Sequence, residues 1–142
     1  MRILLKKKKI DMINYFTWTE FDKSVEHIAD KCKLINFSGI YGVPRGGLCL
    51  AVALSHKLNI KLISEPIENS LIVDDVYETG TTLNIFKEIE GAKFFVLFSK
   101  IKPTWWNTVH LTEKRQWIVF PWESTLNLQS ERSEYLIKRG LS

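Results

Sequence analysis

Two adjacent carboxylates stand directly before a short run of small hydroxyl residues, in the stretch LIVDDVYETGTTL that spans residues 71–83. Asp74 and Asp75 repel each other, so together they need hydroxyl donors, a metal ion or a basic neighbour. The run from Thr79 to Thr82 contains a flexible glycine and opens an expected helix, so its hydroxyls and free backbone N–H groups form an anion cradle. Carboxylates for sugar hydroxyls beside a cradle for phosphate suit a sugar phosphate. By itself, the Thr-Gly run is also typical of an ordinary helix-capping turn.

A second loop with the same capacity lies in YGVPRGGL, residues 41–48. Gly46 and Gly47 expose backbone N–H groups, and the Arg45 guanidinium presents a fork of donors to phosphate oxygens. A plain strand-to-helix turn with a surface arginine is the alternative interpretation. Two anion-binding loops predict that two phosphate groups bind at once. Neither the P-loop pattern nor the G-x-G-x-x-G pattern is present.

The apolar pattern predicts the elements that must hold these loops. Continuous apolar strands that alternate with helices indicate an α/β fold with a central, mostly parallel five-stranded sheet flanked by helices. The helix over 48–58 is apolar nearly all round, so we expect it to be buried. In such sheets ligands bind at the carboxyl ends of the strands, where both loops would lie. The expected strands are 38–43, 60–64, 70–75, 93–99 and 116–120, and the other expected helices are 19–32 and 81–90.

Length and charge favour a single domain, residues 1–142, with a basic N-terminal extension over 1–14. The net charge of +4 is matched by the run Lys6–Lys9, which predicts a solvated arm. No second basic cluster with interleaved aromatic residues supports nucleic-acid binding, so we do not expect it.

No apolar run is long enough for a membrane span, and no signal peptide is evident. Cys32 and Cys49 are expected to be reduced, which favours a cytoplasmic protein.

The two loops carry a resemblance to a known family. LIVDDVYETGTTL resembles the phosphoribosyl-pyrophosphate (PRPP) motif of the type I phosphoribosyltransferases, and YGVPRGGL resembles their pyrophosphate loop. VLFSKIKP, RQWIVFPWE and FTWTEF resemble segments of the bacterial xanthine-guanine phosphoribosyltransferases, so the resemblance covers residues 15–123. It implies the family's parallel sheet with a short C-terminal base-binding segment. It also implies transfer of the phosphoribosyl group from PRPP to a 6-oxopurine (guanine, xanthine or hypoxanthine), with Mg²⁺, in purine salvage.

The resemblance implies a role for each residue of the two loops. Asp74 and Asp75 would hold the ribose 2′- and 3′-hydroxyls, and Asp75 would lie nearest Mg²⁺. Arg45 and Gly46 would hold the pyrophosphate. The backbone groups that would hold the 5′-phosphate are those of Thr79, Gly80, Thr81 and Thr82.

The resemblance also implies how the purine base is held. Lys100 would meet the 6-oxo group, Trp117 would stack on the ring, and the backbone of Ile118 would read the substituent near position 2. Glu78 stands where most relatives have Asp, and would accept the proton that the reacting purine nitrogen loses. Apart from the resemblance, Lys100 at a strand end is usually a solvated charge and Trp117 is more often a core residue. The pair Trp105-Trp106 has no counterpart in the family and would line the base pocket or an oligomer contact.

The lid is where the sequence departs from the family. A long flexible loop between the second and third strands closes over the family's site, whereas only SEPIENS, residues 64–70, joins them here. So short a loop cannot exclude water. Either residues 102–114 or a neighbouring subunit would cover the site, or turnover is poor. A noncatalytic PRPP- or nucleotide-binding regulatory protein is therefore the alternative hypothesis. The resemblance also implies a homodimer or homotetramer.

Overall fold

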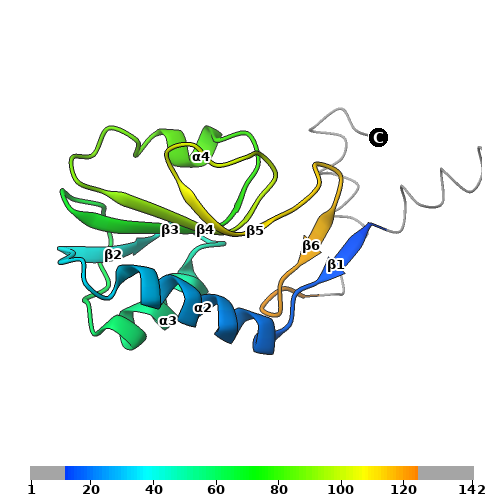
Figure 1. The fold of residues 1–142 in the computed structure, drawn as a ribbon, viewed down its shortest axis with the longest axis horizontal. Helices are drawn as coiled ribbons and strands as arrows, with labels where there is room; N and C mark the ends of the chain where they lie inside the picture. Colours follow the sequence, from blue (N-terminus) through cyan, green and yellow to red (C-terminus); the bar gives the residue numbers. More distant parts are fainter. Residues whose placement is uncertain (1–11, 125–142) are drawn as a thin grey trace, which may run out of the picture. The chain divides into compact units, whose positions relative to one another are not determined.

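The structure is a computed structural model that describes residues 12–124 (Figure 1). The expected lysine arm at Lys6–Lys9 lies outside these residues. The described chain groups into two compact units, residues 12–18 with 115–124 and residues 19–114. No helix within 12–124 has the length and apolar content of a membrane span. The elements are β1 (Ile13–Tyr15), α2 (Trp18–Cys32), β2 (Gly39–Gly42), α3 (Leu48–Leu58), β3 (Ser70–Tyr77), α4 (Thr81–Asn84), β4 (Lys93–Ser99), β5 (Asn107–Leu111) and β6 (Trp117–Val119).

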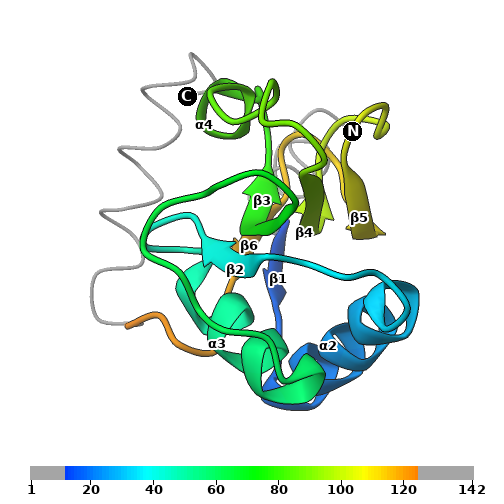
Figure 2. The same ribbon diagram turned by 90° about the vertical axis from the view of Figure 1, so that its left-hand side faces the viewer.

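A four-stranded parallel sheet in the order β2-β3-β4-β5 forms the centre of the larger unit (Figure 2). Three expected strands, 38–43, 70–75 and 93–99, are present as β2, β3 and β4. These strands are continuous apolar runs, and the middle ones are buried on both faces. The predicted α/β class with a parallel sheet flanked by helices is confirmed.

The predicted count of five strands in this sheet is wrong. Residues 60–64 contribute only a single bridge, between Leu62 and Ile40. The stretch 116–120 contains β6, which belongs to the smaller unit. The fourth strand is instead β5, which the sequence did not reveal because NTVHL mixes polar and apolar residues. As an edge strand it is only partly buried, so it carries no continuous apolar run.

Helices α2 and α3 cover one face of this sheet, and α4 lies on the other (Figures 1 and 2). The buried residues of α2 recur at helical spacing as predicted: Phe21, Val25, Ile28, Ala29 and Cys32. The bounds predicted for α3 are confirmed, and it packs on β2 and β3. The prediction that α3 is buried all round is wrong, because Leu48 and Val52 are 42% and 44% exposed.

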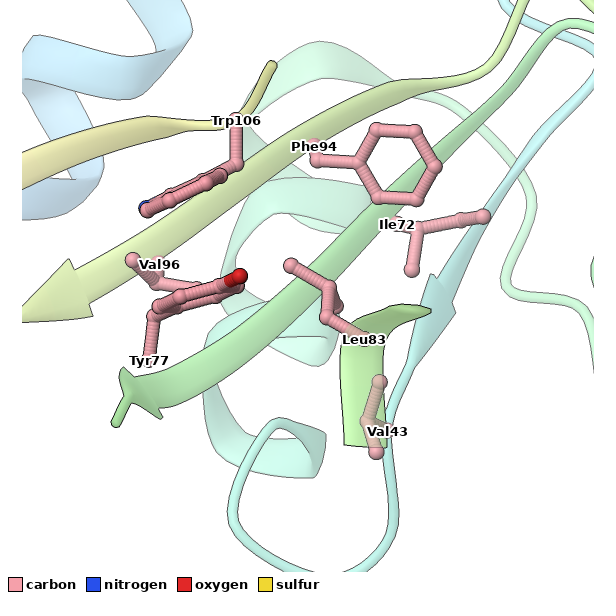
Figure 3. Close-up of a cluster of buried hydrophobic side chains, with 7 residues drawn as sticks. All are labelled: Val43, Ile72, Tyr77, Leu83, Phe94, Val96 and Trp106. Carbon is pink, nitrogen blue, oxygen red and sulfur yellow. The ribbon is translucent and has the colours of Figure 1, made fainter. Parts of the chain in front are cut away.

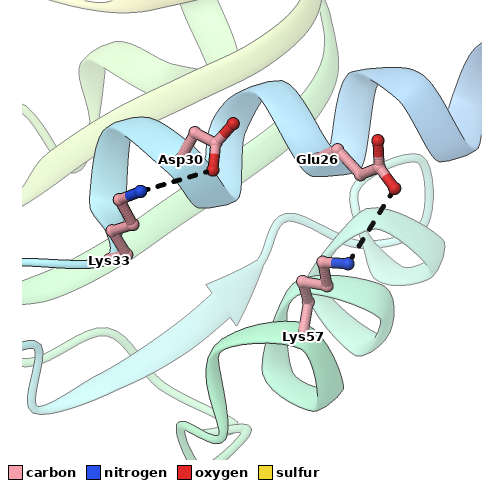
Figure 4. A network of polar contacts seen from close by, with 4 residues as sticks. All are labelled: Glu26, Asp30, Lys33 and Lys57. Atoms are coloured by element: carbon pink, nitrogen blue, oxygen red, sulfur yellow. Dashed lines mark ion pairs between the residues drawn. The ribbon is translucent and has the colours of Figure 1, made fainter.

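An ion pair joins α2 to α3, between Glu26 Oε1 and Lys57 Nζ at 4.0 Å (Figure 4). Both side chains are more than half exposed, so the pair contributes at most about 1 kcal/mol. The apolar faces of the two helices therefore hold them against the sheet, because Leu50, Ala51 and Leu54 of α3 are fully buried.

The opposite face of the sheet carries a second apolar cluster beneath α4 (Figure 3). The predicted helix 81–90 ends after Asn84. Residues 85–92 continue as turns in which an N–H bonds the carbonyl three residues earlier, as from Phe86 to Leu83 and from Ile89 to Phe86. These three apolar side chains still face one cluster, as predicted. Its buried members are Val43, Ile72, Tyr77, Leu83, Phe94, Val96 and Trp106.

The smaller unit contains a two-stranded parallel sheet, β1 with β6. Ile13 and Asn14, at the end of the expected N-terminal extension, lie in β1. Aromatic rings pack beside this sheet, where Phe120 stacks on Trp122 with 4.8 Å between centroids. The Glu123 carboxylate accepts a hydrogen bond of 2.9 Å from the Phe120 N–H, which fixes the turn after β6.

Candidate functional site

The adjacent carboxylates lie within β3, which continues past its expected end to Tyr77. Asp74 is only 8% exposed, and its Oδ1 accepts a hydrogen bond of 2.8 Å from the Asp75 N–H. Asp75 Oδ1 accepts one of 2.7 Å from the Val76 N–H. Burial, together with the negative charge of Asp75, raises the pKa of Asp74 to about 8, and burial raises the pKa of Asp75 as well. Burial thus disfavours negative charge on these two carboxylates unless a donor or a cation compensates it.

The loop between β2 and α3 lies directly against this carboxylate pair. A Cβ added to Gly46 would stand 2.7 Å from Asp75 Oδ1, and one added to Gly47 would stand 3.0 Å from the Asp74 Cα. Only glycine allows so close an approach of the two segments. Arg45 is exposed, and the peptide bond between Pro44 and Arg45 is cis. The prediction that both loops meet at one edge of the sheet is therefore confirmed.

The Thr-Gly run forms a tight loop from the end of β3 into α4. Gly80 is buried with a φ of 81°, a left-handed conformation that favours glycine. Its carbonyl accepts the Asn84 N–H at 2.8 Å, and the hydroxyls of Thr79 and Thr81 lie 2.9 Å apart. Thr82 is exposed like these two threonines. The exposed threonine side chains can reach a ligand, and the first amides of α4 have no carbonyl partner within the helix.

Two further residues of the expected site meet at the carboxyl ends of β3 and β4. Lys100 Nζ lies 3.9 Å from Glu78 Oε1, and the side chains are 4% and 21% exposed. The Lys100 N–H donates to the Tyr77 carbonyl at 2.9 Å, which fixes the turn after β4. The alternative that Lys100 is a solvated charge is wrong. Glu78 also acts electrostatically on Asp75, so the acidic pair and the Lys100–Glu78 pair share one edge of the sheet.

Ser99 shapes the turn that presents Lys100, a role that the sequence did not signal. Its hydroxyl donates to the Ile101 carbonyl at 2.5 Å and accepts from Trp106 Nε1 at 3.2 Å. Trp106 is 5% exposed and belongs to the core cluster, with Trp105 packed against that cluster. Trp106 is therefore a core residue, a role that the sequence did not predict, and Trp105 beside it is partly buried.

The remaining expected base-binding residues lie in the smaller unit. Trp117 and Ile118 are consecutive in β6, opposite Ile13 and Asn14 of β1. Ile118 is 6% exposed, and Trp117 is partly buried. The structure thus brings Lys100 together with the carboxylates and the two loops, and it holds Trp117 and Ile118 in a separate unit.

Hydrogen bonds hold the short connection before β3 at the amino-terminal ends of the strands. The Ser38 hydroxyl donates to the Glu68 carbonyl at 2.5 Å, and the Asn69 N–H donates to the Glu90 carbonyl at 2.9 Å. Both bonds lie where β2 and β3 begin, which is the end of the strands away from Asp74 and Asp75. Within residues 102–114, suggested as a covering segment, residues 107–111 form β5 and Trp106 belongs to the core.

This edge of the larger unit can bind a diol that carries anionic groups. Carboxylates accept hydrogen bonds from hydroxyls, and exposed amides, hydroxyls and the Arg45 guanidinium donate them to anions. Within residues 12–124, no group of three or more His, Cys, Asp or Glu side chains gathers as a metal site. A cation here would therefore take at most two carboxylates from the protein, and its remaining ligands from a bound molecule.

Several known proteins with similar sequences or structures are purine phosphoribosyltransferases. Xanthine-guanine phosphoribosyltransferase of Chromohalobacter salexigens is 26% identical, over 75% of this chain and 82% of the relative. That of Idiomarina loihiensis is 25% identical, over 80% of this chain and 88% of the relative. The crystal structure of a purine phosphoribosyltransferase from Pyrococcus horikoshii is 30% identical, covers 79% of this chain and 94% of its own, and superposes with a TM-score of 0.66. No protein-family model matches the chain.

Proposed function

Since this chain belongs to the type I phosphoribosyltransferase family, whose members are glycosyltransferase enzymes, we propose that it transfers the 5-phosphoribosyl group of PRPP to a 6-oxopurine in purine salvage. Guanine, xanthine and hypoxanthine are the candidate bases. The observation that carries this proposal is the contact of 3.9 Å between Lys100 Nζ and Glu78 Oε1, at the same edge as Asp74 and Asp75.

The two loops and the carboxylate pair would hold PRPP. We assign the ribose 2′- and 3′-hydroxyls to Asp74 and Asp75, whose raised pKa values reflect a need for donors. Arg45 and Gly46 would bind the pyrophosphate, since Gly46 lies against Asp75. The backbone groups assigned to the 5′-phosphate are those of Thr79, Gly80, Thr81 and Thr82.

The reaction breaks the bond between ribose C1 and the pyrophosphate oxygen and forms a bond from C1 to a purine nitrogen. The sugar passes through an oxocarbenium-like transition state, as in glycoside cleavage. Pyrophosphate leaves as an anion, so the site must neutralise its charge, and Arg45 with the loop amides can do so. Glu78 takes the proton that the purine nitrogen loses, acting as general base.

Lys100 provides the preference among bases. An ammonium group only donates hydrogen bonds, so it favours the 6-oxo group of guanine, xanthine or hypoxanthine over the 6-amino group of adenine. Lys100 is 4% exposed and lies beside Glu78, so that carboxylate helps to hold its ammonium group at the site. The stacking of Trp117 on the base and the contact of the Ile118 backbone near position 2 stay predictions from the resemblance.

Mg²⁺ would enter with PRPP as part of the substrate complex. The adjacent buried carboxylates fit a cation, and Asp75 is the proposed protein ligand, since Mg²⁺ commonly combines one or two carboxylates with substrate phosphates. Bound there, Mg²⁺ would offset the charge of the pyrophosphate. A homodimer or homotetramer and a cytoplasmic location are further parts of this proposal, and sedimentation of the purified chain would check the first.

Incubation of the protein with Mg²⁺, PRPP and each of guanine, xanthine, hypoxanthine and adenine tests the proposed function. We expect nucleotide and pyrophosphate in equal amounts from at least one 6-oxopurine, and much less from adenine. The Glu78→Gln protein is the matched control for chemistry. If calorimetry detects PRPP binding but no base yields a nucleotide, the noncatalytic regulatory alternative replaces this proposal.

A further inference from the structure

Tyr77 ends β3 directly before the Thr-Gly loop, and its ring is locked in place. The residue is 7% exposed, and the ring stacks on Trp106 with 3.7 Å between centroids and 13° between planes. Figure 3 shows the two rings lying face to face. Trp106 is itself held by its hydrogen bond to Ser99. The tyrosine ring therefore has one fixed position, which the loop must follow.

The hydroxyl end of this ring reaches the Thr-Gly loop. A Cβ added to Gly80 would collide with the Tyr77 hydroxyl and would lie 2.8 Å from its Cζ. In Figure 3 the hydroxyl oxygen points toward Leu83 of α4. The structure gives this hydroxyl no hydrogen bond to another residue in the described range 12–124. A polar group carried on an otherwise buried side chain thus ends at the loop.

The charges around the loop make an additional neutral donor valuable. Residues 77–84, YETGTTLN, contain no lysine or arginine, and Glu78 brings a negative charge to their start. A phosphate in this loop must therefore be held by amides and hydroxyls. Burial raises the pKa of Tyr77, so its hydroxyl stays protonated at neutral pH and can donate.

We propose that the Tyr77 hydroxyl donates a hydrogen bond to the 5-phosphate monoester of the ribose ligand in the Thr-Gly loop. This proposal rests on the proposed function, because that function supplies the phosphate. The same monoester is present in PRPP and in the nucleotide product, so the residue would serve both. Tyr77 is then a binding residue that determines specificity for a phosphorylated ribose.

Calorimetry on wild type and Tyr77→Phe tests this proposal with three ligands: Mg²⁺–PRPP, ribose 5-phosphate and pyrophosphate. The substitution keeps the ring and removes only the hydroxyl. We expect the affinity for PRPP and ribose 5-phosphate to fall about tenfold or more, as for a hydrogen bond to a charged group. Pyrophosphate lacks the 5-phosphate, so its affinity should not change. Tyr41→Phe, at a partly buried tyrosine packed on the same cluster, is the matched control and should bind all three ligands as wild type does.

The thermal unfolding midpoint of Tyr77→Phe should stay within about 2 °C of wild type. An affinity for ribose 5-phosphate within twofold of wild type would overturn the proposal. Equal weakening toward pyrophosphate, with a lowered unfolding midpoint, would also overturn it, since it would indicate a structural role. If wild type binds ribose 5-phosphate but forms no nucleotide, the proposed transfer is refuted. The affinities of wild type and Tyr77→Phe for ribose 5-phosphate would then still test the role of the Tyr77 hydroxyl. Wild type that binds none of the ligands would refute both.

Discussion

Lys100 Nζ and Glu78 Oε1 lie 3.9 Å apart, at the ends of two neighbouring strands of the parallel sheet. The lysine side chain is 4% exposed and the glutamate 21%, so each charge helps to compensate the other. A purine that receives a hydrogen bond from the lysine and gives a proton to the glutamate would interact with both. This pair therefore connects base recognition with proton removal in the proposed reaction.

Glu78→Gln should lower kcat about 100-fold, because the amide cannot accept the purine proton. The affinity for PRPP should stay near that of wild type, since the carboxylate pair and both loops are unchanged. Steady-state kinetics with a saturating 6-oxopurine measure the first effect, and calorimetry with Mg²⁺–PRPP measures the second. Glu78→Asp is the conservative control and should retain part of the activity. A kcat for Glu78→Gln within twofold of wild type would remove Glu78 from the chemistry.

Lys100→Met should raise KM for 6-oxopurines about tenfold or more, as expected for loss of a hydrogen bond from a charged donor. The KM for adenine should change little or fall, so the preference for 6-oxopurines should decrease. Kinetics with hypoxanthine and adenine, whose substituents differ at position 6 with a matching change at N1, measure the ratio. Lys87→Met, at an exposed lysine over the Trp105 ring, is the matched control. If the ratio of the two bases is unchanged, Lys100 does not read position 6.

Asp75→Asn should weaken Mg²⁺–PRPP binding about tenfold or more while the fold is kept, because a neutral amide removes charge next to the cation. Calorimetry with and without EDTA measures this effect, and circular dichroism checks the fold. In wild type, chelation of Mg²⁺ should reproduce most of the loss, and it should add little in Asp75→Asn. An unchanged PRPP affinity in the variant would contradict the assignment of Asp75.

The stability of the free protein should fall as the pH rises toward 8, because of Asp74. Its pKa is raised from 3.8 to about 8 by burial and by the charge of Asp75, so between these values the folded protein binds more protons than the unfolded chain. Because the folded protein binds up to one more proton, each unit of pH increase lowers the free energy of unfolding by up to about 1.4 kcal/mol. Urea unfolding of wild type and Asp74→Asn from pH 5 to pH 8 measures the effect. The free energy of unfolding of the variant should increase relative to that of wild type as the pH rises. If the difference between the two proteins does not change with pH, Asp74 is not the cause.

Much of the fold was predictable because it depends on local pattern. The apolar positions of α2 and the continuous apolar strands β2, β3 and β4 follow directly from residue spacing. The edge strand β5 was not predictable, because it is only partly buried and shows no apolar run. The end of the helix expected over 81–90 was also missed, since the turns after Asn84 keep the same apolar face.

The sequence by itself determined the chemical groups of the site: paired carboxylates, two glycine-containing loops that can bind anions, and a lysine and a glutamate beside them. Residue type and spacing carry this information, because donors, acceptors and backbone freedom are properties of each residue. Only the tertiary structure decided which groups meet. The pairing of Lys100 with Glu78, the approach of Gly46 to Asp75 and the stacking of Trp106 on Tyr77 all join segments distant in the chain. Such contacts depend on the order of the strands and on packing across the sheet, which no local pattern records.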